Sequence, residues 1–575
     1  MEKRLIVAVL LMSAVIMLTN LLFPPPLPEE TSVEPDSVVT VQTAPERAAP
    51  VPLRTPLPAA PVRVDTVTVV SDLYRLSFVT RGAGLRRAEL LDYQSYTEDG
   101  PVQLVPEGAR EFLSSRLVVG ADTIDLSSLP FAPSEPQLRV DAATGPGTLT
   151  FRHGAEDGFG VMVEYTFRPD EYLIDVRGQV TGLGGQRASL LTEIGPGLAP
   201  HEAFDHRNEQ QLAVVTRALG DVTRLRMNKL EGQRLLPQPF TWVGIKDKYF
   251  LAALIAGEEA PMEGAVLRRL ADTQQLYPED RSVTVPQAEL VAIFPVSATG
   301  EFSFQAYVGP QDYTNLRGVG FDLENVTQYA YRWLEPVIRP VAALILWVLR
   351  WLHNTLGVEY GWVLVLFGVI MRIVLWPLNA KAMRAQMKNM GVQPLMTEIR
   401  EKYKDDPQAQ QQEMMRLYKE HGFNPLAGCL PLLVPFPVLI TLFFVFQNTI
   451  AFRGAEFLWL PDLSLRDPIF ILPAFLVISM FALQWISMKM SGMDQNPQMK
   501  MMMYVMPVMM GVLFFSLPAG LNLYYATTNV ASIPQQMLIA RERKRAQAEA
   551  KIAATAPKPP PAAAAAAARK RKRKK

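Results

Sequence analysis

Gly361-Trp-Val-Leu-Val-Leu-Phe-Gly-Val-Ile-Met-Arg372-Ile-Val-Leu-Trp-Pro-Leu378 is an apolar run that contains a single charged residue, Arg372. A helix over 361–378 would nearly cross a bilayer core of about 30 Å. A charge at the centre of such a span costs about 2.5 to 3.5 kcal/mol on insertion scales, so it normally faces a wet cavity or a partner. Alternatively, the long side chain reaches the inner interface along its aliphatic stem. Spacing alone leaves both interpretations open.

Five other apolar segments accompany this run. The first, Leu5–Phe23, follows Lys3 and Arg4 and precedes three prolines, so we expect an uncleaved anchor over 1–23; a cleaved signal peptide is the alternative. The remaining segments follow Arg372, at about 427–447, 469–487, 501–517 and 520–540. Together they predict a polytopic α-helical membrane protein with six transmembrane helices.

The basic residues of the loops predict the orientation of these spans. Eight Lys or Arg residues lie within 379–426, whereas 448–468 holds only Arg453 and Arg466. Because short cytoplasmic loops are rich in Lys and Arg, 379–426 and both termini are expected inside. Within this loop, Ala380–Tyr403 and a helix that starts at Asp406-Pro407 form a helical hairpin, either a mobile docking element or a solvated connector.

The long segment before Arg372 has a different pattern. Residues 24–65 are rich in Pro, Ala and Glu and predict an extended linker. Residues 66–325 alternate and are rich in β-branched side chains, which predicts a large β-sandwich on the outer side of the membrane. The strongest strand signals are Val64–Val70, Thr148–Arg152, Val161–Phe167, Leu173–Val180, Val283–Phe294 and Phe302–Val308.

A mixed aromatic and charged helix is expected between the β-domain and the first of the later spans. Residues 326–357 contain Trp333, Arg339, Trp347, Arg350 and Trp351. This mixture favours a helix that lies in the interface plane over one that spans the bilayer.

The composition of the 575 residues agrees with one water-soluble and one lipid-embedded part. Hydrophobic residues make up 49% and charged residues 20%, and the mean hydropathy is +0.09. A disordered chain is excluded and a plain cytosolic enzyme is disfavoured. The single cysteine, Cys429, cannot form an internal disulfide, so burial or lipid must hold the fold.

Catalytic and cofactor motifs are absent from the sequence. His201 and His206 are five residues apart in a β-rich region, whereas a zinc-protease signature needs two histidines four apart on a helix. There is no Walker A loop, no G-x-S-x-G and no CxxC. We therefore expect no enzymatic activity, no metal and no cofactor.

The later apolar segments contain polar residues that could lie near Arg372. Gln484, Asn522, Thr527, Thr528 and Asn529 could share one hydrated cavity with it, and no Asp or Glu lies in those spans. A cation without a counter-charge in a wet groove would attract an acidic group that arrives from elsewhere. The numerous late methionines are typical of packing, or else of a soft surface that adapts to many apolar segments.

The C-terminal tail, 541–575, ends in seven basic residues: Arg569, Lys570, Arg571, Lys572, Arg573, Lys574 and Lys575. Such a run either contacts anionic lipid and fixes the topology or binds ribosomal RNA without sequence specificity. The composition does not choose between these roles.

Several motifs occur together in the segments described above. They are Trp242-Val-Gly-Ile-Lys-Asp-Lys-Tyr249-Phe250, Gly361-Trp362, Trp376-Pro377-Leu378, Gln393-Pro394, Gln412-Glu-Met-Met-Arg-Leu-Tyr418, Asn424-Pro425-Leu426-Ala-Gly-Cys429-Leu-Pro431, Met506-Pro507 and Leu517-Pro518-Ala-Gly520-Leu-Asn-Leu-Tyr524-Tyr525. As a set with Arg372, they resemble the YidC-type membrane protein insertases, in the Gram-negative form with a large periplasmic domain. The resemblance runs from the first anchor to the sixth span.

This resemblance implies a five-helix insertase core, 358–540, around a hydrophilic groove that opens to the cytoplasm and to lipid. Arg372 would receive the hydrophilic tail of an incoming chain, and Gln484 and Asn522 would line the groove. The apolar segment would leave along a hydrophobic slide formed by Cys429, Leu433, Phe436, Met509 and Leu513. Ser516 and Gly511 depart from the family pattern near this slide.

The resemblance also implies partners and a location. The chain would insert and help fold newly made membrane proteins in the bacterial inner membrane, alone or with the Sec translocon, which the β-domain would contact. The basic tail and the hairpin would bind the ribosome or anionic lipids.

Two other functions compete with this interpretation. A secondary transporter with Arg372 as an anion site would usually show an inverted repeat with paired broken helices, and the core spans show no such pairing. A membrane-anchored sugar-binding or sugar-modifying protein would suit a large β-sandwich, but fold alone is weak evidence of function.

Overall fold

The computed structural model describes residues 65–555 apart from short gaps at 109–111, 155–157, 204–207, 238, 257–260, 278–282, 330–333, 378, 381–392, 405, 421–435 and 492–496. Apart from Leu334 and Glu335, these residues belong to one unit of the chain, Val62–Ala330 with Pro336–Lys575. The predicted anchor, nearly all of the linker and the basic run Arg569–Lys575 lie outside the described residues.

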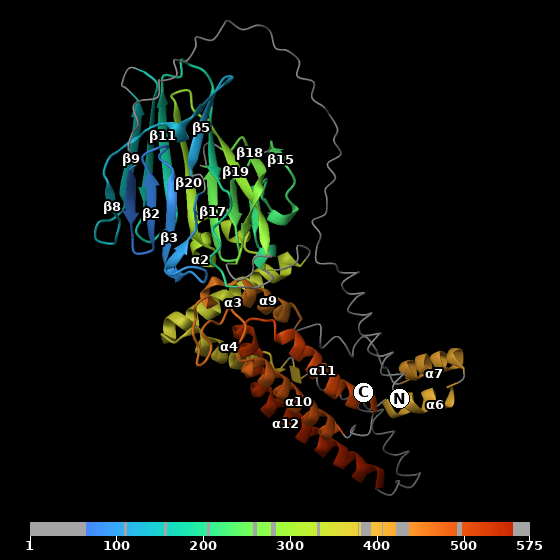
Figure 1. The fold of residues 1–575 in the computed structure, drawn as a ribbon. Helices are drawn as coiled ribbons and strands as arrows, with labels where there is room; N and C mark the ends of the chain where they lie inside the picture. The colour runs from blue at the N-terminus through green and yellow to red at the C-terminus, as the bar shows by residue number, and fades with distance from the viewer. Residues whose placement is uncertain are drawn as a thin grey trace, which may run out of the picture. The chain divides into compact units, whose positions relative to one another are not determined.

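Residues 66–310 form three β-sheets (Figure 1). The nine-stranded sheet has the order β14-β13-β16-β17-β20-β11-β10-β9-β7, the six-stranded sheet β15-β18-β19-β12-β5-β6, and the five-stranded sheet β4-β3-β2-β1-β8. The strands are β1 Thr66–Val70, β2 Tyr74–Val79, β3 Leu85–Gln94, β4 Pro101–Gln103, β5 Ser114–Val119, β6 Asp122–Asp125, β7 Ala132–Pro133, β8 Gln137–Arg139, β9 Gly147–Gly154, β10 Gly160–Phe167, β11 Leu173–Thr181, β12 Ala188–Ile194, β13 Ala213–Ala218, β14 Asp221–Arg226, β15 Gln233–Leu236, β16 Trp242–Lys246, β17 Phe250–Ala256, β18 Gly264–Gln275, β19 Thr284–Val296 and β20 Glu301–Pro310.

The sheets pack face to face through aromatic side chains. Phe294 of β19 stacks on Phe304 of β20 with ring centroids 4.6 Å apart, which joins the six-stranded and nine-stranded sheets. Phe78 of β2 lies 4.8 Å from Tyr165 of β10, which joins the five-stranded sheet to the same nine strands. The prediction of a large β-rich domain is confirmed, and strands such as β11 bury alternate residues, as the pleat of a strand with one buried face requires.

Two adjacent strands of the nine-stranded sheet are buried throughout. Trp242–Lys246 and Phe250–Ala256 pair as β16 and β17, and every one of their residues is buried. The motif Trp242–Phe250 therefore forms a central hairpin of the domain.

The helices follow the sheets along the chain: α2 Tyr313–Val319, α3 Glu335–Leu356, α4 Tyr360–Val374, α6 Gln393–Lys402, α7 Pro407–Glu420, α9 Phe436–Asn448, α10 Ile471–Ser491, α11 Pro497–Phe514 and α12 Ala519–Thr555. Among the described residues, only α3 is both long and apolar enough to cross a membrane, judged by length and composition. Shorter apolar helices cover Tyr360–Val374, Ile471–Ile486 and Tyr504–Phe514. Six crossings therefore stay a prediction.

Helix α3 has two apolar sides. Ile338, Ala342, Ile345, Leu349 and Leu352 are buried at helical spacing. The aromatic Trp347 and Trp351 are 62% and 51% exposed on another side. The interfacial orientation of this helix stays a prediction.

Small residues allow close approach in the helical core. A Cβ at Gly361 of α4 would lie 2.0 Å from the Phe457 ring, and one at Gly511 of α11 would lie 2.4 Å from Val477 of α10. Long helix α12 packs against both α4 and α10. Gly361 and Gly511 are therefore required by packing.

The structure describes two helices of the predicted hairpin, α6 and α7. Asp406 Oδ1 accepts hydrogen bonds from the backbone N–H groups of Gln408 and Ala409, both at 3.0 Å, and caps α7. Helices α6 and α7 contact each other. Pro407 at the first helical position has no N–H group, so the Asp406 side chain satisfies the two backbone N–H groups that follow it.

Candidate functional site

Arg372 lies near the C-terminal end of α4, which ends at Val374. Its side chain is half-buried, and its buried Nε atom has no hydrogen-bond partner. In the described part of the chain, Arg372 forms no ion pair. The adjacent Ile373 and Val374 are 64% and 62% exposed, so α4 carries its arginine next to an exposed apolar side.

Two contacts fix the register of α4 against α12. A Cβ at Gly368 would lie 3.1 Å from Thr527 Cγ2, and Gln535 Nε2 donates to the Trp376 carbonyl at 3.1 Å. From the first contact to the second, the residue number rises by the same amount in α4 (Gly368 to Trp376) as in α12 (Thr527 to Gln535), so the two helices run in parallel. Arg372 stands midway between Gly368 and Trp376 and is therefore level with the middle of 527–535.

Polar side chains of α10 and α12 meet at that level. Asn529 Nδ2 of α12 donates to Ser479 Oγ of α10 at 3.1 Å. Ser532 Oγ donates to the Asn529 carbonyl at 2.6 Å. We name the set Arg372, Ser479, Asn529, Ser532 and Gln535 the polar strip.

The strip contains polar atoms that the chain does not satisfy. Gln535 is fully buried, and its Oε1 has no hydrogen-bond partner, like Oε1 of Gln536 and Nε of Arg372. Buried polar atoms in proteins nearly always bond to the chain or to ordered water. The strip has two such atoms, in Arg372 and Gln535, and the neighbouring Gln536 has a third, so this region suits a hydrated environment or a polar guest.

Gln484 lies close to the polar strip, judged by its position along α10. It is half-buried on α10, five residues beyond Ser479, which is about 7.5 Å along the helix. The backbone N–H group of Ala519 donates to the Leu465 carbonyl, so α12 begins beside the segment that leads into α10, and the two helices run in the same direction. Gln484 therefore lies near the level of Gln535.

Asn522 lies elsewhere. It is fully buried, and its Nδ2 donates to the Phe514 carbonyl at 3.1 Å, which closes the turn between α11 and α12. It precedes the level of Arg372 by about nine residues of α12, or about 14 Å. The structure thus brings Arg372 and Gln484 near one level but does not bring Asn522 to it.

Thr527 and Thr528 of α12 are satisfied locally. Thr527 Oγ1 donates to the Leu523 carbonyl at 2.8 Å, and Thr528 Oγ1 donates to the Tyr525 carbonyl at 3.0 Å. Such bonds to the preceding turn are common for hydroxyls in helices. These side chains do not offer free donors to a guest.

The hydrophobic slide is only partly described. Leu513 is 53% exposed and Met509 is half-buried on α11. Phe436 begins α9, whereas Cys429 and Leu433 lie outside the described residues, as does the basic run 569–575. The two described side chains of α11 are available to an apolar partner.

A second polar cluster has a different character. Arg453, in the loop between α9 and α10, is buried; its Nε donates to Glu202 Oε1 at 2.8 Å, and its guanidinium lies 4.6 Å from the Tyr96 ring. His201 Nε2 lies 2.9 Å from an Asp247 carboxylate oxygen. We name Arg453, Glu202, His201, Asp247 and Tyr96 the charged junction, because it joins the β-domain to this loop.

Opposite charges compensate one another in the charged junction. Burial would lower the pKa of Arg453, but the nearby Glu202 carboxylate holds that pKa above its ordinary value. Burial raises the pKa of Glu202 despite Arg453. Burial also opposes the charge of Asp247, but His201 and two backbone N–H groups hold its pKa below the ordinary value. The cluster is therefore a structural ion network.

The polar strip offers a positive charge and hydrogen bonds but no assembled catalytic group. In the part of the chain that the structure describes, no three His, Cys, Asp or Glu side chains are placed to hold a metal ion. His201 belongs to the charged junction instead. The strip can bind and orient an acidic or polar group.

Sequence reasoning missed Ser479, Ser532 and Gln535 as partners in the strip. All three are polar residues inside apolar segments, which is the signal that identified Gln484 and Asn529. Their role becomes visible only when the register of α4, α10 and α12 is known.

Two family models match the chain. The model described as 60Kd inner membrane protein matches residues 351–547, and the model described as YidC periplasmic domain matches residues 66–344.

Curated relatives match nearly the whole length. The membrane protein insertase YidC of Syntrophus aciditrophicus is 28% identical over 570 residues, which cover 94% of this chain and 100% of that protein. The one of Bordetella avium is 33% identical over 497 residues, 84% of each chain. Among solved structures, a galactose mutarotase-like protein from Lactobacillus casei covers 43% of this chain at 12% identity, with a TM-score of 0.26.

Proposed function

The chain belongs to the YidC family of membrane protein insertases, and on that premise we propose that it receives the polar flank of an incoming membrane protein at the polar strip around Arg372. The chain is a membrane protein insertase of the inner membrane with a periplasmic β-rich domain. Family membership favours this function over the secondary transporter and the sugar-modifying protein.

The free energies of insertion explain why such a strip is useful. Transfer of an apolar segment from water to lipid is strongly downhill, whereas the polar flank that must cross meets a barrier. A hydrated strip part-way through the bilayer shortens that crossing and leaves the end states unchanged. The membrane potential adds a pull on a negative flank that moves outward.

The observation that carries the proposal is the half-buried guanidinium of Arg372, which has no counter-charge among the described residues and a buried Nε without a partner. A carboxylate of the incoming flank would form a charge-assisted hydrogen bond with it. Gln484 and Asn529, near the same level, would bond polar groups of the flank. Asn522 would support the turn between α11 and α12.

The test is insertion of a small single-span protein with a short acidic N-terminal tail into sealed liposomes that contain the purified chain. Protease protection of the tail, without ATP, reports insertion. We expect Arg372→Ala to reduce protection about tenfold or more, since one charge-assisted hydrogen bond is worth about 1.5 to 3 kcal/mol. Arg372→Lys should retain most of the activity.

A substrate whose acidic tail residues are changed to Asn and Gln is the matched control. Its insertion should respond much less to Arg372→Ala. Equal losses for the acidic and the neutral substrate would remove the charge role of Arg372 and leave the family function intact.

We also propose the remaining parts of the route. The apolar segment would leave along Met509 and Leu513 of α11, with Cys429, Leu433 and Phe436 on the facing span. The chain would cross the membrane six times, with both termini cytoplasmic and the β-domain periplasmic.

The partners are proposed from charge and from the family resemblance. The basic run Arg569–Lys575 and the hairpin 379–426 would bind the ribosome or anionic lipids, and the β-domain would contact the Sec translocon. Removal of 569–575 should weaken ribosome binding in a salt-dependent manner, measured by co-sedimentation.

A further inference from the structure

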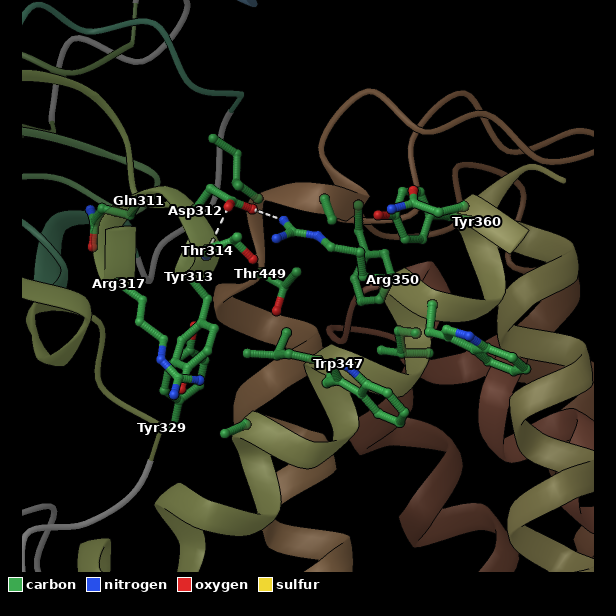
Figure 2. Close-up of a pocket in the computed structure, with 18 residues that line it drawn as sticks. Gln311, Asp312, Tyr313, Thr314, Arg317, Tyr329, Trp347, Arg350, Tyr360 and Thr449 are labelled. Atoms are coloured by element: carbon green, nitrogen blue, oxygen red, sulfur yellow. Dashed lines mark hydrogen bonds and ion pairs between the residues drawn. The ribbon is translucent and has the colours of Figure 1, made fainter. Parts of the chain in front are cut away.

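A cavity of about 390 Å³ lies where α2, α3 and the turn after α9 meet, away from the polar strip (Figure 2). Most of its wall is apolar or aromatic. Tyr313 and Tyr329 stand beside the end of the β-domain, and Trp347 projects from α3.

The wall continues onto an exposed aromatic surface. Trp347 and Trp351 are 62% and 51% exposed, and their rings stack with centroids 6.4 Å apart. Exposed tryptophans of this kind gather where a membrane meets water. The next helix, α4, carries Trp362, which is 51% exposed as well. The cavity therefore opens beside a surface that suits lipid.

Two polar groups in the cavity have no partner among the residues that the structure describes. Thr449 is only 8% exposed, and its buried Oγ1 has no hydrogen-bond partner. Arg317 lines the cavity, is exposed, and forms no ion pair among the residues that the structure describes. A hydroxyl and a guanidinium are both hydrogen-bond donors that suit a phosphate oxygen.

The other charges in the wall are already neutralised. Arg350 forms an ion pair with Asp312, and the same carboxylate accepts from the backbone N–H groups of Thr314 and Asn315 at 2.9 and 3.1 Å. Asp312 is the only carboxylate among the lining residues. The wall thus offers a free cation but no free anion.

From these observations we propose that the cavity binds the headgroup of an anionic phospholipid from the outer leaflet. Arg317 and Thr449 hold the phosphate, and the upper part of one acyl chain lies against Trp347. The rest of that chain follows the exposed aromatic side of α3. A zwitterionic lipid binds less well, because its ammonium group finds no unpaired carboxylate in the wall.

The experiment is native mass spectrometry of the purified, delipidated full-length chain titrated with phosphatidylglycerol or phosphatidylcholine in detergent. We expect one tightly bound phosphatidylglycerol and at least tenfold weaker binding of phosphatidylcholine. Arg317→Ala should weaken the phosphatidylglycerol site about tenfold, and the nearly isosteric Thr449→Val should weaken it severalfold. Arg317→Lys should retain it.

Arg234→Ala is the matched control, since it removes one exposed arginine from β15, and Arg234 is not among the residues that line the cavity. The proposal would be overturned if Arg317→Ala and Thr449→Val bound phosphatidylglycerol as tightly as the wild type, or if the wild type bound the two lipids equally. Displacement of the lipid by millimolar inorganic phosphate would overturn the lipid assignment in favour of a free-phosphate site. Near-ultraviolet circular dichroism verifies that each variant is folded.

Discussion

Two arginines in this chain, Arg453, which is buried, and Arg372, which is half-buried, have opposite surroundings. Arg453 of the charged junction is paired with Glu202 at 2.8 Å, and its guanidinium also lies 5.5 Å from the Phe250 ring. Arg372 of the polar strip has no such counter-charge in the described part of the chain, and its Nε is unsatisfied. The first arginine joins two parts of the fold, whereas the second is the one for which we propose a partner from outside the chain.

The surroundings of the two arginines predict a structural role for Arg453 and a functional role for Arg372. A buried ion pair contributes little net stability, but removal of one partner is costly because the other charge stays buried. A charge without a counter-charge inside a membrane-embedded fold is costly, and such residues often mark functional sites. The two sites therefore predict opposite effects of the same kind of substitution.

The largest effect is expected at the charged junction. Arg453→Ala should lower the free energy of unfolding by about 3 to 5 kcal/mol, because it leaves the buried Glu202 carboxylate unpaired. Urea denaturation of the full-length chain in detergent, followed by tryptophan fluorescence, measures it. The double variant with Glu202→Gln should recover much of the loss. A loss below about 1 kcal/mol for Arg453→Ala would remove the contrast with Arg372.

A smaller loss is expected near the start of α4. Gly361→Ala places a Cβ within 2.0 Å of the Phe457 ring, and such overpacking costs about 1 to 3 kcal/mol. Gly368→Ala is the control on the same helix, where the nearest atom, Thr527 Cγ2, is 3.1 Å away. The same denaturation should rank Gly361→Ala below Gly368→Ala in stability. The reverse order would contradict the close contact at Phe457.

Lys246 is a buried cation whose charge depends on pH, so it adds a test based on the pH dependence of stability. Burial, with the nearby Arg224 guanidinium, lowers the pKa of Lys246 to about 7 from 10.5. Between these values the unfolded chain binds more protons than the folded one, so stability increases as pH rises above about 7. The slope from this group is at most about 1.4 kcal/mol per pH unit.

The variant Lys246→Met isolates that contribution. Denaturation of wild type and variant at pH 7, 8 and 9 should show a gain with pH in the wild type that the variant lacks. Parallel curves would mean that Lys246 keeps its proton throughout this range in both states.

The smallest effect on stability is expected at Arg372. Because no ion pair is lost within the described chain, Arg372→Met should leave the free energy of unfolding unchanged or raise it by about 1 kcal/mol. The same variant should lose insertion of acidic-tailed substrates. A destabilisation comparable with that of Arg453→Ala would assign Arg372 a structural role.

The sequence predicted several elements because their causes are local. Asp406-Pro407 caps α7 as expected, since a carboxylate beside the first helical turn needs no tertiary contact. Strands such as Leu173–Thr181 were visible because alternation follows directly from the pleat. The unpaired charge of Arg372 was also expected, because the later spans contain no acidic residue.

Other features depend on contacts between distant segments. Asn522 and Asn529 look alike in the sequence, yet one closes a turn on Phe514 and the other bonds Ser479. Glu202 and Arg453 are far apart along the chain, so no periodicity could pair them. The register of α4 against α12 decided which polar residues share the level of Arg372.

The sequence by itself therefore determined the classes of segment, the apolar runs and the single charge within the run 361–378, since each is set by hydrophobicity and spacing within one segment. Tertiary structure alone decided that Arg453 is neutralised and that Arg372 has no counter-charge among the described residues, because pairing requires that side chains from separate elements meet within hydrogen-bond distance.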